Sequence, residues 1–369
     1  MEFESVENRS TQALENIEPN RNIYTKDKQK IVNDYGFNKD RENIDGMNEY
    51  IQRNQPRFYE SFELTDFIGS GSTGVVYKGK SKNKDNKQFY AFKFCIQNNK
   101  SSRKSINRYR EIYNQKQLHH KYIVQIFAFY KINDTDFFSV SELGTYGNLD
   151  YFLHYFLKKC ILSETFINYI TKPILEGLNY MHKKHFLHLD IKKGNIVLNA
   201  EMNIKLIDFS STFCFKDYQP NDLIIFPMIG TGRYMPPEVL NKTKMEVKYG
   251  GKIDVYALGV TLYNLAFGIY PYGLSNIKAD DYTKMAEHLN TANLEFPRNI
   301  EISRKFENFL RKTLEKDYIK RYSIKDALED PWVKGWDIIS EEKENTGILE
   351  NFIIKLISDD ISKFNQYIK

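Results

Sequence analysis

Apolar and polar residues alternate along the first part of the chain, which predicts a strand-rich section. Residues 62–68 alternate and lead through a glycine cluster into residues 75–77, the pattern of two strands joined by a turn. Residues 101–119 have the pattern of a single helix. Further apolar runs predict strands at 89–94, 123–130 and 137–140. We therefore expect a β-sheet with one main helix.

Beyond residue 142 the apolar period becomes helical. Residues 254–269 form the most apolar helix of the chain. It begins at Asp254, contains Asn264 and falls short of the roughly 18 apolar residues that a membrane span needs. We therefore predict a buried core helix and no membrane insertion. Other helices are predicted at 149–157 and 164–182, and short strands at 196–198 and 204–207.

The two ends of the chain differ from this body. Residues 1–56 are rich in Asn, Glu, Lys, Asp and Arg, so we expect a charged, mostly disordered or loosely helical extension, with a docking or regulatory arm as the alternative. Residues 337–369 are a charged tail whose apolar residues share one helical face. Packing of this face on the body is the default expectation, and a partner site is the alternative.

Composition narrows the class of protein. With 41% hydrophobic residues, the chain of 369 residues is expected to fold. Its 53 basic and 48 acidic residues leave a net charge of +5, which gives no case for a nucleic-acid binder. Cys95, Cys160 and Cys214 are too few and scattered for a disulfide framework or a zinc site. The acidic N-terminus lacks the apolar region of a secretory signal, so we expect a cytoplasmic location, with nuclear entry left open.

A glycine cluster and a lysine are the first candidates for chemistry. Residues 69–74 read G-x-G-x-x-G between two predicted strands, so they form a hairpin rather than a dinucleotide-binding turn. Glycine lets a backbone approach phosphates closely. Lys93 follows Gly74 by 19 residues on a strand, and Glu111 on the next helix can supply a counter-charge. The alternative is that Lys93 and Glu111 are ordinary surface charges.

The strongest motifs follow in the helical part. Residues 188–195 read H-L-D-I-K-K-G-N, and D-F-S begins at Asp208, 13 residues after Asn195. Residues 230–238 read G-T-G-R-Y-M-P-P-E, and Asp254, Gly259 and Arg321 come later. With the glycine loop, Lys93 and Glu111, this ordered set resembles the eukaryotic protein kinase family over about residues 57–336.

The resemblance implies an α+β fold with two lobes. The small lobe, 57–141, would be a β-rich sheet with one main helix. A hinge at 142–147 would lead into a larger helical lobe at 148–336. Residues 1–56 and 337–369 would be extensions of this kinase domain.

The resemblance also implies roles for single residues. Asp190 would accept the proton of the substrate hydroxyl, and Lys192 would steady the γ-phosphate. Asn195 and Asp208 would hold Mg²⁺ through oxygen atoms. Lys93 would hold the α- and β-phosphates and pair with Glu111, and Thr231 would position the substrate. The implied ATP-binding residues are Ile68, Gly69, Ser70, Gly71, Ser72, Thr73, Gly74, Val75, Val76, Ala91, Lys93, Ser141, Glu142, Gly144, Asn195, Val197 and Asp208.

The chain departs from the family pattern in the segment that phosphorylation usually controls. Leu189 replaces the Arg of H-R-D, which in the family pairs with a phosphorylated activation loop. Residues 221–230 contain no Ser, Thr or Tyr. We therefore hypothesise that activity does not need phosphorylation of this stretch, and that the apolar residues 223–226 hold the loop instead.

Three other departures concern single positions. Ser210 replaces the Gly of D-F-G, which should make this segment harder to flip. Gln115 lies one helical turn after Glu111, where the family usually packs an apolar residue, so its amide needs a partner. Ser141, just before the hinge, is small and should open a pocket behind the adenine.

The function that the resemblance implies is a serine/threonine protein kinase. Lys192 and Thr231 resemble the Ser/Thr class rather than the tyrosine class. The cofactors would be ATP and Mg²⁺, with Mn²⁺ as a second metal, and the partners would be protein substrates and a regulator bound by the terminal extensions. The alternative is a catalytically weak or silent scaffold, which Leu189, Ser210 and Gln115 keep open. A kinase of small molecules is disfavoured by residues 230–238.

Overall fold

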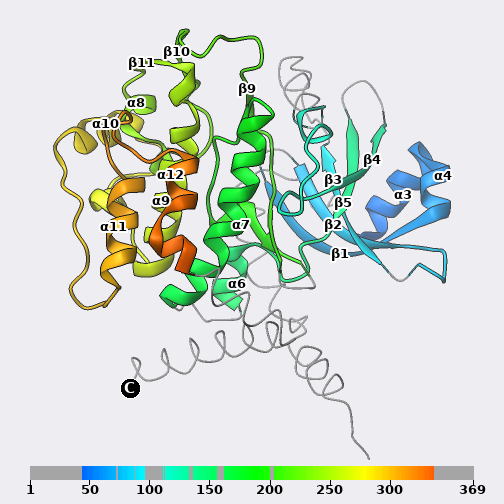
Figure 1. Ribbon diagram of the computed structural model, residues 1–369. Helices are drawn as coiled ribbons and strands as arrows, with labels where there is room; N and C mark the ends of the chain where they lie inside the picture. Colours follow the sequence, from blue (N-terminus) through cyan, green and yellow to red (C-terminus); the bar gives the residue numbers. More distant parts are fainter. Residues whose placement is uncertain are drawn as a thin grey trace, which may run out of the picture. The chain divides into compact units, whose positions relative to one another are not determined.

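The computed structural model describes residues 44–71, 74–86, 88–95, 111, 113–132, 136–155, 162–199 and 203–335. These residues form two compact units (Figure 1). The described part of the first unit comes from residues 44–95 and 127–143, and that of the second from 111–126 and 144–335.

The first unit is built on a five-stranded sheet in the order β1-β2-β3-β5-β4. The pairs β1–β2, β2–β3 and β3–β5 are antiparallel. The run predicted as a strand at 123–130 becomes one only from residue 126, because Ile123 bridges to Leu206 of the second unit instead. The strands are β1 (Phe62–Gly71), β2 (Gly74–Ser81), β3 (Phe89–Cys95), β4 (Ile126–Lys131) and β5 (Phe137–Glu142).

Two helices precede this sheet and belong to its core. In α3 (Ile44–Asn54), Met47 and Ile51 are buried, and in α4 (Pro56–Ser61) Phe58 is buried. They join one apolar cluster with Phe92 and Phe138 of the sheet. We expected a mostly disordered or loosely helical extension over residues 1–56. Residues 44–54 are helical, but their helix packs into the core of the first unit, and residues 1–43 lie outside the described part. The sequence pattern of this helix is weak. Ile44, Met47 and Ile51 follow the helical period, but most positions between them are polar.

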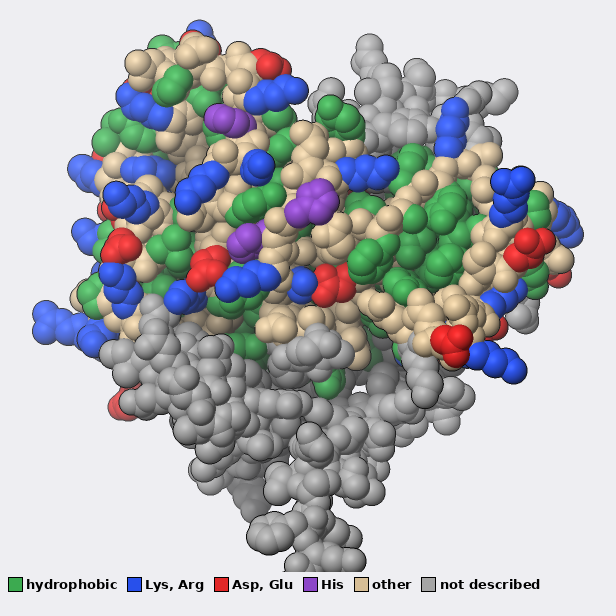
Figure 2. Space-filling model, turned by 45° about the vertical axis from the view of Figure 1, so that its right-hand side comes forward, with side chains coloured by type: hydrophobic (Ala, Val, Ile, Leu, Met, Phe, Trp, Pro, Cys, Tyr) green, Lys and Arg blue, Asp and Glu red, His purple; other side chains and the backbone are tan. Residues whose placement is uncertain are grey.

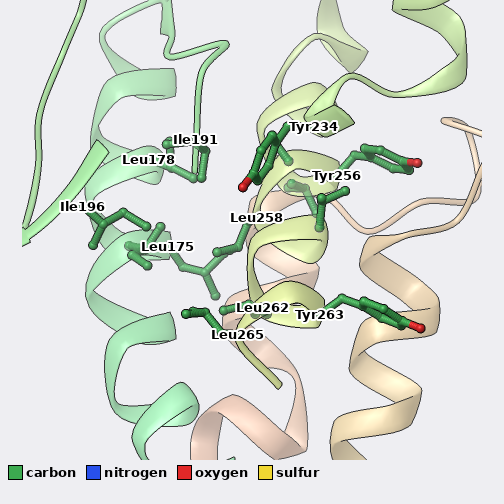
Figure 3. Packing of buried hydrophobic residues seen from close by; sticks show 14 of the residues in the cluster. Leu175, Leu178, Ile191, Ile196, Tyr234, Tyr256, Leu258, Leu262, Tyr263 and Leu265 are labelled. Carbon is green, nitrogen blue, oxygen red and sulfur yellow. The ribbon is translucent and has the colours of Figure 1, made fainter. Parts of the chain in front are cut away.

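The second unit is organised around α7 (Glu164–Lys183) and α9 (Gly251–Phe267), which pack against each other. Ser163 caps α7 by accepting a hydrogen bond from the Phe166 amide, and α9 ends at Gly268, whose φ is 70°. Figure 3 shows Leu175 and Leu178 facing Leu258 and Leu262 across this contact. The other helices are α6 (Leu149–Tyr155), α8 (Pro237–Leu240), α10 (Tyr282–Thr291), α11 (Arg304–Thr313) and α12 (Ile324–Glu329).

The helix predicted at 254–269 is confirmed as a core helix. Its residues from Ile253 to Phe267 are all buried, and it packs against α7, α11 and α12. Among the helices that the structure describes, none combines the length and apolarity needed to cross a bilayer.

Short strands and 3₁₀ turns connect the helices of this unit. The strand pairs are β6 (Phe186–Leu187) with β9 (Phe213–Cys214), β7 (Ile196–Leu198) with β8 (Ile204–Leu206), and β10 (Leu223–Ile225) with β11 (Lys244–Glu246). The turns are η2 (Lys193–Asn195), η3 (Gly232–Tyr234), η4 (Val247–Tyr249) and η5 (Pro271–Asn276).

Residues 111–126 group with the second unit, although we expected them in the β-rich lobe. Their backbone explains the difference. The Val124 amide donates to the Leu206 carbonyl of β8, the Leu206 amide donates to the Tyr122 carbonyl, and the His119 amide donates to the hydroxyl of Tyr180 on α7. The segment is therefore fixed to β8 and α7.

The surface carries charges of both signs. Figure 2 shows Lys and Arg side chains scattered over the described surface, with Asp and Glu side chains among them. Some of these form exposed pairs, such as Lys80 with Glu63 at 2.9 Å. Exposed pairs of this kind contribute little to stability, about 0–1 kcal/mol each.

Burial of α3 leads to a test of whether this helix is part of the folded domain. Replacing Ile51 by Ala should lower the free energy of unfolding by about 2–5 kcal/mol, because a buried side chain is lost from the aromatic core. Urea denaturation measures the change. Glu49→Ala, at an exposed position of the same helix, should change it by less than about 0.5 kcal/mol. Equal effects of both substitutions would contradict the packing of α3.

Candidate active site

The backbone around the H-L-D motif is held by a buried carboxylate. Asp254 of α9 has no exposed surface, and its oxygens accept hydrogen bonds from the amides of His188 (2.9 Å) and Leu189 (2.8 Å). His182 at the end of α7 adds a third contact through Nε2 at 2.8 Å. Burial opposes the ionisation of Asp254, but the hydrogen bond and charge of His182, with the contacts from His188, hold its pKa below the usual value.

His182 was not singled out from the sequence. It lies 72 residues before Asp254, and no spacing rule links a helix C-terminus to the start of a distant helix. His188 is fully buried and also contributes: its Nδ1 accepts from the Asp190 amide at 3.3 Å, and its Nε2 lies 3.2 Å from the Ile207 carbonyl. This pattern assigns the proton to Nε2 and joins the motif to the residue before Asp208.

Asp190 lies at the centre of a compact polar network. Its Oδ2 accepts from Lys192 Nζ at 2.7 Å and from Asn195 Nδ2 at 2.9 Å. Its Oδ1 accepts from the Thr231 hydroxyl at 2.8 Å, and Lys192 Nζ donates to the same hydroxyl at 2.7 Å. The structure therefore brings together four residues that the sequence separates by up to 41 positions.

Asn195 and Asp208 provide oxygen atoms suited to a hard cation. Asn195 Nδ2 also donates to the Asp190 backbone carbonyl at 2.8 Å, which fixes the amide and leaves Oδ1 as an acceptor. The Ile207 amide donates to the Asn195 carbonyl at 3.0 Å, so the residue before Asp208 is bonded to Asn195. A carboxylate and an amide oxygen fit the preference of Mg²⁺.

Two residues of this region have left-handed backbones that only strong local constraints maintain. Leu189 has φ 61° and Asp208 has φ 62°. The Leu189 carbonyl lies 2.3 Å from where a Cβ at position 230 would be, so Gly230, with φ 97°, admits no side chain. Ser210, in contrast, is not among the described residues with positive φ, so this conformation needs no glycine there.

The segment 221–230 is anchored by one aromatic residue. Phe226 is 2% exposed and packs on Phe213, with ring centroids 5.7 Å apart. Leu223 and Ile225 are 63% and 50% exposed, so our expectation that all of 223–226 hold the loop is wrong for these two. They lie on β10, where alternate side chains point to opposite faces, and only Ile224 between them packs on the core.

A buried ion pair fixes the following segment. Arg321 donates to both oxygens of Glu238 at 2.6 Å and 3.0 Å, and both side chains are almost fully buried. Breaking the pair would leave an unpaired charge in the protein interior, which is costly. The pair therefore holds residues 230–238 to the segment between α11 and α12.

In the first unit, the sheet separates the predicted ATP-binding residues into two faces. Phe92 and Phe94 point into the aromatic core, whereas Ala91 and Lys93 alternate with them and are half-buried. Lys93 is paired with Val76 on β2 and Ser139 on β5, and Ala91 with Ser141. Val75 is buried in the core cluster, so its side chain lies on the face opposite to Val76.

The glycine hairpin is only partly described. Ile68, Gly69, Ser70 and Gly71 end β1, and Gly74 begins β2, while Ser72 and Thr73 lie outside the described residues. A Cβ on Gly74 would lie 2.3 Å from the Phe94 carbonyl, so the backbones approach too closely for a side chain.

The remaining predicted residues are divided between the units. Glu142 ends β5, and the Ser141 hydroxyl lies 3.4 Å from its carbonyl. Gly144 contacts Val197 in the second unit, where a Cβ would approach the valine to 2.6 Å. Glu111 is buried in the second unit and Lys93 lies in the first, so their pairing stays a prediction.

Comparison with known proteins identifies the class. Residues 62–333 match the family model of the protein kinase domain. The chain therefore belongs to the protein kinase domain family. It is 28% identical over 278 residues to serine/threonine-protein kinase ULK3 of Mus musculus, covering 74% of this chain and 55% of that protein.

Other relatives give the same class. Calcium-dependent protein kinase 4 of Plasmodium falciparum is 31% identical over 292 residues, covering 77% of this chain and 52% of the relative. Serine/threonine-protein kinase TIO of Arabidopsis thaliana is 29% identical over 293 residues, covering 79% of this chain and 21% of the relative. The chain spans about half the length of ULK3 and of calcium-dependent protein kinase 4, and about a fifth of the length of TIO.

The anchor in the segment 221–230 can be tested by a matched pair of substitutions. Phe226→Ala should lower the free energy of unfolding by about 3–5 kcal/mol and expose the segment to limited proteolysis. The reason is that Phe226 carries the one buried side chain of residues 221–230. Ile225→Ala should change the free energy by less than about 0.5 kcal/mol, since that side chain is half exposed. Wild-type protease resistance in Phe226→Ala would refute the anchor.

Proposed function

We propose that this chain is a serine/threonine protein kinase that transfers the γ-phosphate of ATP to hydroxyl groups of protein substrates. The observation that carries the proposal is the network around Asp190. Its carboxylate, the Lys192 ammonium group and the Thr231 hydroxyl are joined by hydrogen bonds of 2.7–2.8 Å. The family match and the printed names of the relatives support the same activity. The activity, substrates and partners of the whole protein are part of this proposal.

In the proposed reaction, the chain mainly positions groups and balances charge. The substrate hydroxyl attacks the γ-phosphorus, the bond to the β-phosphate oxygen breaks, and Asp190 takes the hydroxyl proton. Lys192 lies 2.7 Å from Asp190, so its ammonium group is placed to steady the transferred phosphate. Thr231 orients Asp190 through its hydroxyl and fixes the segment that receives the substrate.

Nucleotide and metal binding involve the other residues. Lys93 would hold the α- and β-phosphates with Glu111 as its counter-charge, and Ile68, Val76, Ala91 and Val197 would enclose the adenine. Asn195 and Asp208 would hold Mg²⁺, or Mn²⁺ as a second option. The metal supplies positive charge that balances the phosphate oxygens.

We also propose that phosphorylation of residues 221–230 is not needed for activity. Leu189 is buried where the family has a phosphate-binding arginine, and the segment has no hydroxyl side chain. Phe226 provides an apolar anchor instead. A cytoplasmic location and a regulator bound by the terminal extensions remain predictions from the sequence.

The second candidate function is a catalytically weak or silent scaffold. Leu189 and Ser210 favour it, because both replace residues of the family pattern. Gln115 no longer supports it, because its amide has a partner: Nε2 donates to the Val124 carbonyl at 3.3 Å. The two candidates differ in whether phosphate is transferred.

Phosphate transfer from labelled ATP to casein and myelin basic protein is the direct test. We expect the chain of 369 residues with Mg²⁺ or Mn²⁺ to transfer phosphate before and after phosphatase treatment, because the segment 221–230 has no hydroxyl side chain to be dephosphorylated. Asp208→Asn should reduce transfer to background by removing a proposed metal ligand. Activity that disappears after phosphatase treatment would contradict autonomy, and ATP binding without transfer would favour the scaffold.

The small residue at position 141 predicts inhibitor sensitivity. ATP-site inhibitors with a bulky group behind the adenine should inhibit the wild type, and Ser141→Met should weaken them by about tenfold or more through steric exclusion, a free-energy change of about 1.4 kcal/mol or more. Inhibitors without that group, measured in the same transfer assay, serve as controls. Equal inhibition of both proteins by the bulky compounds would count against an open pocket.

A further inference from the structure

Gln115 is a buried polar residue on the helix that carries Glu111. It is 9% exposed, and Glu111, one turn earlier, is 4% exposed. Its Nε2 donates to the backbone carbonyl of Val124 at 3.3 Å. Burying an amide costs free energy unless it is hydrogen-bonded. The bond to Val124 offsets this cost for Gln115. The bond links the helix to a segment nine residues further along the chain.

The Val124 carbonyl belongs to a backbone that is itself fixed. The Val124 amide donates to the Leu206 carbonyl at 3.0 Å, and the Leu206 amide donates to the Tyr122 carbonyl at 2.9 Å. Ile123 and Leu206 form a parallel bridge. The His119 amide donates to Tyr180 Oη at 3.0 Å, which ties the same segment to α7. Val124 is therefore a firm point of attachment for the helix.

Strand β8, to which Val124 is bonded, leads directly to the proposed metal ligands. Leu206 is the last residue of β8, and the Ile207 amide donates to the Asn195 carbonyl at 3.0 Å. Asp208 follows. Hydrogen bonds join Gln115 to Val124 and Val124 to Leu206, and the next residue along the chain, Ile207, bonds Asn195. All of these residues lie in the second unit.

We propose that Gln115 is a positioning residue that fixes Glu111 relative to Asn195 and Asp208 through its hydrogen bond to Val124. This inference rests on the proposed kinase function and adds a determinant within this chain. The amide N–H is the essential feature, because an apolar residue of similar size would fill the space without bonding Val124. Loss of the donor frees the helix while the metal ligands stay in place.

Two substitutions of nearly equal size separate the donor from the volume. Q115M removes the donor at every pH. Q115E supplies a carboxylic acid, which donates to the Val124 carbonyl only while protonated, and burial raises the pKa of such a group above its usual 4.3 or so. The charged groups on the linked elements, Glu111, His120, Lys121 and Lys205, are all present in the wild type. Q115M keeps them and adds no charge, so the ratio of its kcat to the wild-type kcat isolates the loss of the donor.

We expect Q115M to lower kcat by about threefold to tenfold at every pH between 5.5 and 8.5, with the KM for myelin basic protein unchanged, since one hydrogen bond is lost. The Q115E ratio should rise toward 1 as the pH falls, because only the protonated acid donates to the Val124 carbonyl. Wild-type kcat in Q115M would overturn the proposal. Thermal denaturation of both variants checks that they fold.

Hydrogen exchange gives a readout that needs no activity. In Q115M, peptide 113–124 should exchange faster than in the wild type, while peptide 163–183 from α7 should be unchanged. Unchanged exchange of peptide 113–124 would overturn the proposal even in an active protein. If the wild type transfers no phosphate, the proposed function fails, and faster exchange in Q115M would still support the bond as the attachment of the helix.

Discussion

Asp254 holds the backbone on which the rest of the site depends. Its buried carboxylate receives two consecutive amides, His188 and Leu189, and keeps the second in a left-handed conformation. Asp190 follows directly, so its carboxylate is placed by bonds that begin in the core of α9. The charge is tolerated because three donors surround it, including His182. The loop that carries Asp190 is therefore positioned by a buried helix rather than by its own turn chemistry.

The loop after Asp208 is held by apolar packing rather than by hydrogen bonds to a buried carboxylate. The family position that binds a phosphate is occupied by buried Leu189, and Phe226 inserts its ring beside Phe213. Leu189 and Gly230 also restrict each other, because the leucine carbonyl occupies the space of a side chain at 230. Apolar packing is present without any modification, whereas a phosphate must be added. This packing is the physical basis on which we propose that activity does not depend on phosphorylation of residues 221–230.

Position 115 shows how a departure from a family pattern can be absorbed. The sequence indicates a buried amide that must find a partner. The structure gives this partner in the Val124 carbonyl, only nine residues away. That carbonyl lies in residues 122–124, which pair with β8 and do not continue β4. The same pairing explains why the predicted strand at 123–130 begins late.

The sequence by itself determined the fold class, most strands, the two central helices and the set of motif residues, because periodicity and ordered motifs are local features. It also placed Asp190, Lys192, Asn195 and Thr231 in one site through the family pattern. The tertiary structure decided which neighbours satisfy buried polar groups: His182 for Asp254 and Val124 for Gln115. It also decided that α3 is core and that Leu223 and Ile225 are exposed. Burial and hydrogen-bond partners arise between distant segments, so a local pattern does not contain them.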